Sequence, residues 1–80
     1  MKSKPNSVNL TIEKKFGASM RHFRILKKLS QEELAFRSGL NRNYISDTER
    51  GTRNVSLRSI AKISRGLGIS IADLFKNIDS

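Results

Sequence analysis

The stretch 31–51 constrains this chain more than any other, because it specifies two short helices joined by a tight bend. Ser30 and Glu33 have the spacing of a capping box, in which a hydroxyl and a carboxylate satisfy unpaired N–H groups at a helix start. Gly39 ends the first helix, since glycine adopts the left-handed backbone conformation without the steric cost of a Cβ. Asn41 is a favoured N-cap for the second helix. The sequence therefore predicts a helix, a turn and a second helix.

The second helix, which ends at Gly51, places Ile45 inward and leaves its polar residues on the outer side. Arginine reads guanine, asparagine reads adenine, and apolar groups contact the thymine methyl. A helix N-terminus also favours phosphate oxygens. We therefore expect the first turn to enter the major groove of DNA. For each of its residues, the alternative is a solvated surface position with no contact to DNA. The candidate base readers are Arg42, Asn43, Tyr44, Ser46 and Asp47. Asp47 would repel phosphate, but could accept from cytosine or orient Arg42 or Arg50.

These residues resemble a known family. The helix-turn-helix of the Cro/phage-repressor (XRE) family is similar at Gln31, Ala35, Gly39, Leu40, Ile45, Glu49 and Gly51, and the likeness extends from about Phe16 to about Phe75. The controller proteins of restriction–modification systems are more similar still, through Asn43-Tyr44-Ile45-Ser46-Asp47, Glu49-Arg50-Gly51, Arg53-Asn54 and Ser56-Leu57. The resemblance implies an all-α, five-helix bundle of the lambda-repressor-like type, with helices 2 and 3 forming the helix-turn-helix.

The resemblance also implies roles for individual residues. Arg24 on the first helix would pair with Glu49, although Glu49 could simply offset charge at the surface. Gln31 would meet a phosphate from the start of helix 2, or else be a plain helix-start residue. Arginines and small polar groups in the loop after the reading helix suit the DNA backbone, which sets register without reading sequence. The candidate phosphate contacts are Gln31, Asn41, Arg50, Arg53, Asn54 and Arg58.

The remaining helices follow from apolar periodicity. A first helix from Thr11 or Ile12 to about Lys27 places Ile12, Phe16, Met20 and Phe23 on a core stripe, and Gly17 suggests close approach of a neighbouring helix. Lys28 stands where many family members have glycine. Val55 and Leu57 resume the core, and Ser56 caps a fourth helix to about Leu67, with Gly66 compatible with an earlier end.

A fifth helix, about Ile71–Asn77, is too apolar for one short terminal helix. Part of it should close the monomer core, and the surplus suits an isologous two-fold contact. We assign Ile71, Phe75 and Ile78 to a dimer interface; packing of all three within the monomer is the alternative. Residues 11–80 are thus one helix-turn-helix domain with a C-terminal dimerisation helix. Residues 1–10 show no helical period and are expected to form a flexible basic arm, idle or touching DNA.

Composition and charge limit the classes of function open to this chain. The net charge is +9 over 80 residues; residues 66–80 carry −1 and residues 1–65 carry +10, which favours a polyanionic partner. With no cysteine and only His22, no metal or thiol chemistry is expected. No catalytic constellation or glycine-rich phosphate loop occurs, so neither an enzyme nor a cofactor is expected. No apolar run approaches the roughly 20 residues that span a bilayer, and a cytoplasmic, membrane-free protein is the expectation.

The leading hypothesis is a sequence-specific regulator of transcription that binds double-stranded DNA. As a controller protein it would act as a homodimer on its own promoter and that of the endonuclease, at a pseudo-palindromic operator. A site beside a promoter would also allow recruitment of RNA polymerase. The alternatives are another XRE-type repressor, an antitoxin subunit that needs a second protein, or a non-specific basic module for membranes or structured RNA.

Overall fold

Five helices make up the fold, which a computed structural model describes for residues 10–78. They are α2 (Ile12–Leu26), α3 (Gln31–Ser38), α4 (Arg42–Arg50), α5 (Leu57–Leu67) and α6 (Ile71–Phe75). Within the described residues no strand occurs, and the predicted all-α five-helix fold is confirmed. The predicted basic arm, 1–10, lies outside the described residues except for Leu10.

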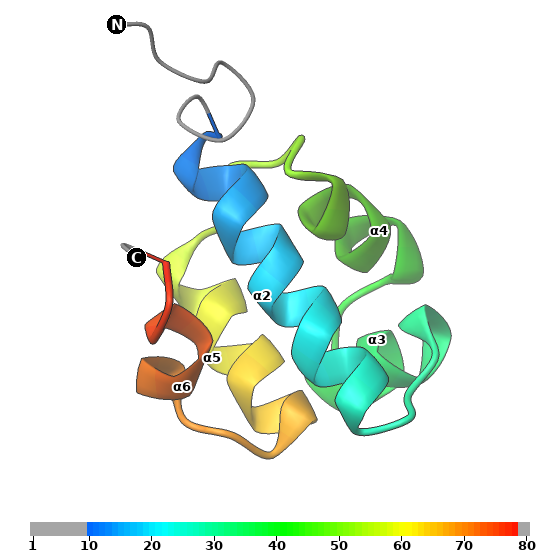
Figure 1. Cartoon of the computed structure of the whole chain (residues 1–80). Coiled ribbons are helices and arrows are strands. Elements are labelled where there is room, and N and C mark those ends of the chain that lie inside the picture. Colours follow the sequence, from blue (N-terminus) through cyan, green and yellow to red (C-terminus); the bar gives the residue numbers. More distant parts are fainter. Residues whose placement is uncertain (1–9, 79–80) are drawn as a thin grey trace, which may run out of the picture.

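Helix α2 runs through the middle of the fold and separates α4 from α6 (Figure 1). Helix α3 packs against both α4 and α5, and α6 closes the opposite side against α2 and α5. The bend between α3 and α4 therefore projects α4 from one side of the bundle. None of the described helices is long and apolar enough to cross a membrane.

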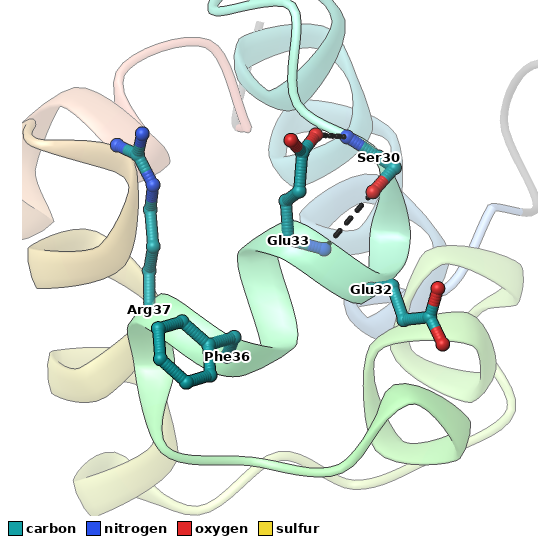
Figure 2. A pocket seen from close by; sticks show the side chains of 5 residues that line it. All are labelled: Ser30, Glu32, Glu33, Phe36 and Arg37. Carbon is teal, nitrogen blue, oxygen red and sulfur yellow. Dashed lines mark hydrogen bonds between the residues drawn. The ribbon is translucent and has the colours of Figure 1, made fainter.

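Each helix begins at a serine, threonine or asparagine whose side chain accepts a backbone N–H from the first turn. At α3 the capping box is complete (Figure 2): the N–H of Ser30 donates to Glu33 Oε1 at 2.7 Å, and the N–H of Glu33 donates to Ser30 Oγ at 3.0 Å. Donation by the Ser30 N–H is the main cause of a lowered pKa at Glu33. The stabilisation is therefore present above the unfolded-state pKa and is lost as pH falls through the lowered folded-state pKa.

Helices α3, α4 and α5 end in left-handed glycines. Gly39, Gly51 and Gly68 have φ of 70°, 75° and 71°. After α2 the same conformation falls on Lys28, with φ 60°. The N–H of Leu29 still reaches the carbonyl of Arg24 at 3.0 Å, which closes the helix end. A lysine thus fills a position at which glycine would be less strained.

Two glycines allow helices to pass in close contact. A Cβ on Gly17 would lie 2.2 Å from the carbonyl oxygen of Thr48, so α2 and α4 touch through their backbones. A Cβ on Gly66 would lie 2.3 Å from Ser38 Oγ, where α5 crosses α3. Helix α5 continues through Gly66 to Leu67 instead of ending early. The glycine inside this helix is explained by the close approach of α3, which leaves no room for a Cβ.

The buried core collects side chains from all five helices and from the segments after α2 and α6. Its members are Phe16, Met20, Leu29, Leu34, Ala35, Ile45, Ile63, Leu67, Leu74 and Ile78. Two residues expected in the core are exposed instead: Ile12 and Leu57, the latter 85% exposed. Each is the first residue of its helix, where the neighbouring helices no longer cover the apolar stripe.

Candidate nucleic-acid interface

The first turn of α4 is exposed and held in a fixed orientation. Asn41 Oδ1 accepts the backbone N–H of Tyr44 at 2.8 Å and caps the helix. Ile45 is fully buried and sets the rotation of α4, so that Arg42 and Asn43 point to solvent. These two of the five candidate base readers are thus available to a ligand. The capping role leaves only the amide NH₂ of Asn41 for the predicted phosphate contact.

A buried ion pair holds α4 against α2. Arg24 Nε lies 2.5 Å from Glu49 Oε2 and Nη2 lies 3.0 Å from Oε1, while Nη1 donates to the carbonyl of Leu29 at 2.8 Å. The Glu49 side chain is only 4% exposed, so it is an anchor between helices and not a surface charge. Gln31 Nε2 also donates to Glu49 Oε1, at 3.1 Å. The Gln31 side chain is therefore engaged internally, and a phosphate there would meet the backbone N–H groups that open α3.

A second cluster joins α4 to the loop after it. Asp47 Oδ1 accepts from Arg50 Nη2 at 2.5 Å, and Asp47 Oδ2 accepts from Arg53 Nη2 at 3.1 Å. Arg50 Nη1 donates to Ser46 Oγ at 2.9 Å. The Arg53 guanidinium lies 4.3 Å from the centre of the Tyr44 ring, a cation–π contact that was not predicted from the sequence. Asp47 and Ser46, expected to read bases, thus hold arginines in the free protein.

The other two predicted phosphate contacts follow this cluster in the sequence. Asn54 lies in the loop after α4 and Arg58 lies in the first turn of α5, and both side chains are exposed. Arg42 and Arg50 are exposed on α4, and Arg53, in the loop after α4, is half-buried, so α4 and this loop carry three of the four candidate cations; Arg58 is exposed on α5. In residues 10–78 no group of His, Cys, Asp or Glu side chains could hold a metal ion.

The candidate dimer surface is only partly as expected. Ile71 and Phe75 are exposed on α6, whereas Ile78 is 6% exposed and belongs to the core, because the turn after α6 folds it inward. The assignment of Ile78 to an interface is therefore corrected. Ile12 and Leu57 add to the exposed apolar area, and we call Ile12, Leu57, Ile71 and Phe75 the apolar end surface. A small cavity of about 100 Å³ opens there, lined by Ile12, Glu13, Phe16, Asn54, Val55, Ile60 and Phe75.

Comparison with known proteins agrees with this geometry. A family profile described as helix-turn-helix matches residues 20–74, which include α3, α4 and α5 entirely. The chain belongs to this helix-turn-helix family. It is an XRE-type protein, as its residue spacing indicated, and the family consists of DNA-binding regulators of transcription.

Individual relatives place this helix-turn-helix protein near the controllers of restriction–modification systems. Control protein C.BamHI of Bacillus amyloliquefaciens is 57% identical over 60 residues, 74% of each chain. Control protein C.MunI of Mycoplasma sp. is 45% identical over 69 residues, 85% of this chain and 93% of the relative. The crystal structure of the restriction–modification controller protein C.AhdI from Aeromonas hydrophila superposes with a TM-score of 0.77 at 51% identity, covering 79% of this chain and 96% of that one. All three relatives are named as control or controller proteins.

Proposed function

We propose that this helix-turn-helix protein is a restriction–modification controller that binds a pseudo-palindromic operator as a homodimer. It would regulate its own promoter and that of the endonuclease. The observation that carries this proposal is the first turn of α4, where Arg42 and Asn43 are exposed while Ile45 and the Arg24–Glu49 pair fix the helix beneath them. A rigid helix with exposed base-reading groups can discriminate between DNA sequences.

The backbone of the operator would be held by the groups around this helix. Phosphate contacts are proposed for the backbone N–H groups at the start of α3 and for the side chains of Asn41, Arg50, Arg53, Asn54 and Arg58. Such contacts position the helix without reading sequence. They also release counterions, so binding should weaken with salt by a slope of about −0.9 for each neutralised phosphate.

The apolar end surface supports the homodimer. Leu57 is 85% exposed and shares this surface with Ile12, Ile71 and Phe75. Ile12 and Phe75 line one cavity. Exposed apolar side chains on a small basic chain are typical of an interface, and the same patch on two copies would be self-complementary around a two-fold axis. The dimer would then present two α4 helices to successive major grooves.

The outer face of α3 supports contact with RNA polymerase. Phe36 is 89% exposed there, between Glu32 and Arg37 (Figure 2). Phe36 lies in the second half of α3, away from the N–H groups at the start of α3 that are assigned to phosphate, so a bound dimer would still present it. We expect Phe36→Ala to leave operator binding unchanged and to lower activated transcription in vitro. Equal activation by the variant would remove this face from the proposal.

The test of the function is binding to the DNA upstream of the protein's own gene. Fluorescence anisotropy should show tighter binding to this DNA than to a shuffled sequence of equal length and composition, by roughly 10³-fold or more at physiological salt. Two chains should bind each site. Equal affinity for both sequences would contradict the proposal and favour a non-specific basic module. Anionic vesicles and structured RNA would then compete with the DNA for the protein. Discrimination that appears only with a second protein would favour an antitoxin subunit.

A further inference from the structure

A carboxylate lies in the middle of the surface assigned to DNA. Asp47 is on α4, between the exposed first turn and the loop that follows the helix. A negative charge here opposes the approach of phosphates, since unit charges of like sign repel most strongly where water is displaced. Its presence needs a physical account beyond the base-reading role that the sequence suggested.

The contacts of Asp47 provide that account. Its two oxygens accept separately from Arg50 and Arg53, at 2.5 and 3.1 Å. Both arginines belong to the proposed phosphate contacts. One carboxylate therefore engages two cations, and the three side chains together carry a net charge of +1 where the arginines alone would carry +2.

Each arginine is also held by a second contact. Arg50 donates to Ser46 on the preceding turn, and Arg53 lies against the ring of Tyr44. The Nε atom of Arg53 is buried without a hydrogen-bond partner, so this guanidinium is drawn inward at a cost that its other contacts offset. In the free protein both guanidinium groups are thus engaged by protein partners, although the Arg50 side chain is 61% and the Arg53 side chain 39% exposed.

We propose that Asp47 determines the ratio of specific to non-specific affinity by withholding Arg50 and Arg53 from phosphates on random DNA. This inference rests on the proposed function. To bind a phosphate, either arginine must give up a charge-assisted hydrogen bond to Asp47. On random DNA nothing compensates that loss. On the operator, base contacts by Arg42 and Asn43 hold α4 close to the groove, and the exchange of Asp47 for phosphate becomes favourable.

The test is Asp47→Asn, which keeps the size of the side chain and removes its charge. Binding to random DNA should tighten by about fivefold or more, with a salt slope steeper by about one to two units, since each newly neutralised phosphate adds about 0.9. Binding to the operator, the sequence that the wild type enriches from a random pool, should change by less than about threefold. The control is Asp73→Asn, the same charge change on α6, which α2 separates from α4 (Figure 1). Asp73 belongs to the capping box of α6, so this variant is also checked for folding, and it should leave the ratio of affinities unchanged.

A second pair of variants separates withholding from simple loss of repulsion. Adding Asp47→Asn to an Arg50→Ala, Arg53→Ala background should give little further gain on random DNA, because no arginine is left to release. An undiminished gain in that background would overturn the inference. Weaker binding of Asp47→Asn to both DNAs would also overturn the inference, because it would indicate that Asp47 orients the arginines for phosphate. A loss of affinity confined to the operator would overturn it too, because it would indicate that Asp47 reads a base.

Failure of this inference is distinct from failure of the proposed function. A wild-type protein that does not discriminate operator from random DNA contradicts the function itself. A wild-type protein that discriminates, with Asp47→Asn giving no gain on random DNA, contradicts only the role of Asp47. Thermal unfolding of each variant verifies folding, and Asp47→Ala, which suits a helix, serves as a second charge-removing variant.

Discussion

At the scale of single residues, Lys28 shows how a local conflict with backbone geometry can persist. It is the only residue other than glycine with positive φ between residues 10 and 78. The left-handed conformation costs a residue with a Cβ about 1–2 kcal/mol. The chain tolerates this because Lys28 lets α2 end and returns Leu29 to the core.

Lys28→Gly should therefore stabilise the protein. We expect a gain of about 0.5–1 kcal/mol, the relief of strain being partly offset by the greater freedom of glycine in the unfolded chain. The measurement is the free energy of unfolding by urea. Lys28→Ala is the matched control, because it removes the charge and keeps the strain. The interpretation fails if Lys28→Ala stabilises as much as Lys28→Gly.

The exposure of Arg42 and Asn43 could be predicted from sequence, because the position of Ile45 fixes which side of α4 faces inward. The partners of Asp47 could not. They depend on the path of the loop after Gly51, which brings Arg53 back over Tyr44. The inward direction of the Gln31 side chain was missed for a similar reason, since its acceptor, Glu49, lies on another helix.

At the scale of elements, the joint between α2 and α4 decides how the proposed reading helix is held. Gly17 brings the two backbones into contact, and the Arg24–Glu49 pair closes the joint beside it. Helix bounds were largely predictable from caps and glycines, as at Ser30 and Gly39. The continuation of α5 through Gly66 was less predictable, because helix propensity alone does not reveal a neighbouring helix that leaves no room for a Cβ.

Glu49→Gln should destabilise the fold by about 3 kcal/mol, because it leaves the buried Arg24 guanidinium without its countercharge. The Arg24 side chain is 12% exposed, so solvent cannot replace the lost partner. Chemical denaturation measures the loss. Glu32→Gln makes the same charge change on the exposed outer face of α3 and should cost less than about 0.5 kcal/mol. Equal losses for the two variants would show that the pair is not the anchor.

At the scale of the whole molecule, two proposed surfaces meet at Asn54, a candidate DNA contact that also lines the cavity at the apolar end surface. The α4 side carries the candidate DNA contacts, and the apolar end surface lies where α2 begins and α5 and α6 meet. The sequence predicted an interface on α6, but not the exposure of Leu57. The exposure of a first helical residue depends on how α5 is rotated against α3, which periodicity within α5 does not reveal.

Leu57→Asp should convert the proposed dimer into monomers, as should Phe75→Asp, because each places a charge in an apolar contact. Leu57→Asp is the cleaner of the two, since Phe75 also packs on Phe16 with ring centres 5.2 Å apart. Sedimentation equilibrium at micromolar concentration measures the mass. Leu26→Asp, at the other end of α2, is the control and should remain dimeric. A dimeric Leu57→Asp would exclude the apolar end surface as the interface.

The most direct test of the whole account is selection of bound DNA from a random pool by the wild type and by Arg42→Ala and Arg53→Ala. The wild type should enrich two related half-sites about 34 Å apart. Arg42→Ala should lose preference at one base pair of each half-site, whereas Arg53→Ala should keep the sequence, bind all DNA more weakly and lower the salt slope by about one unit. Arg42→Ala enriching an unchanged sequence, or the wild type enriching none, would contradict the assignment of α4 as the reading helix.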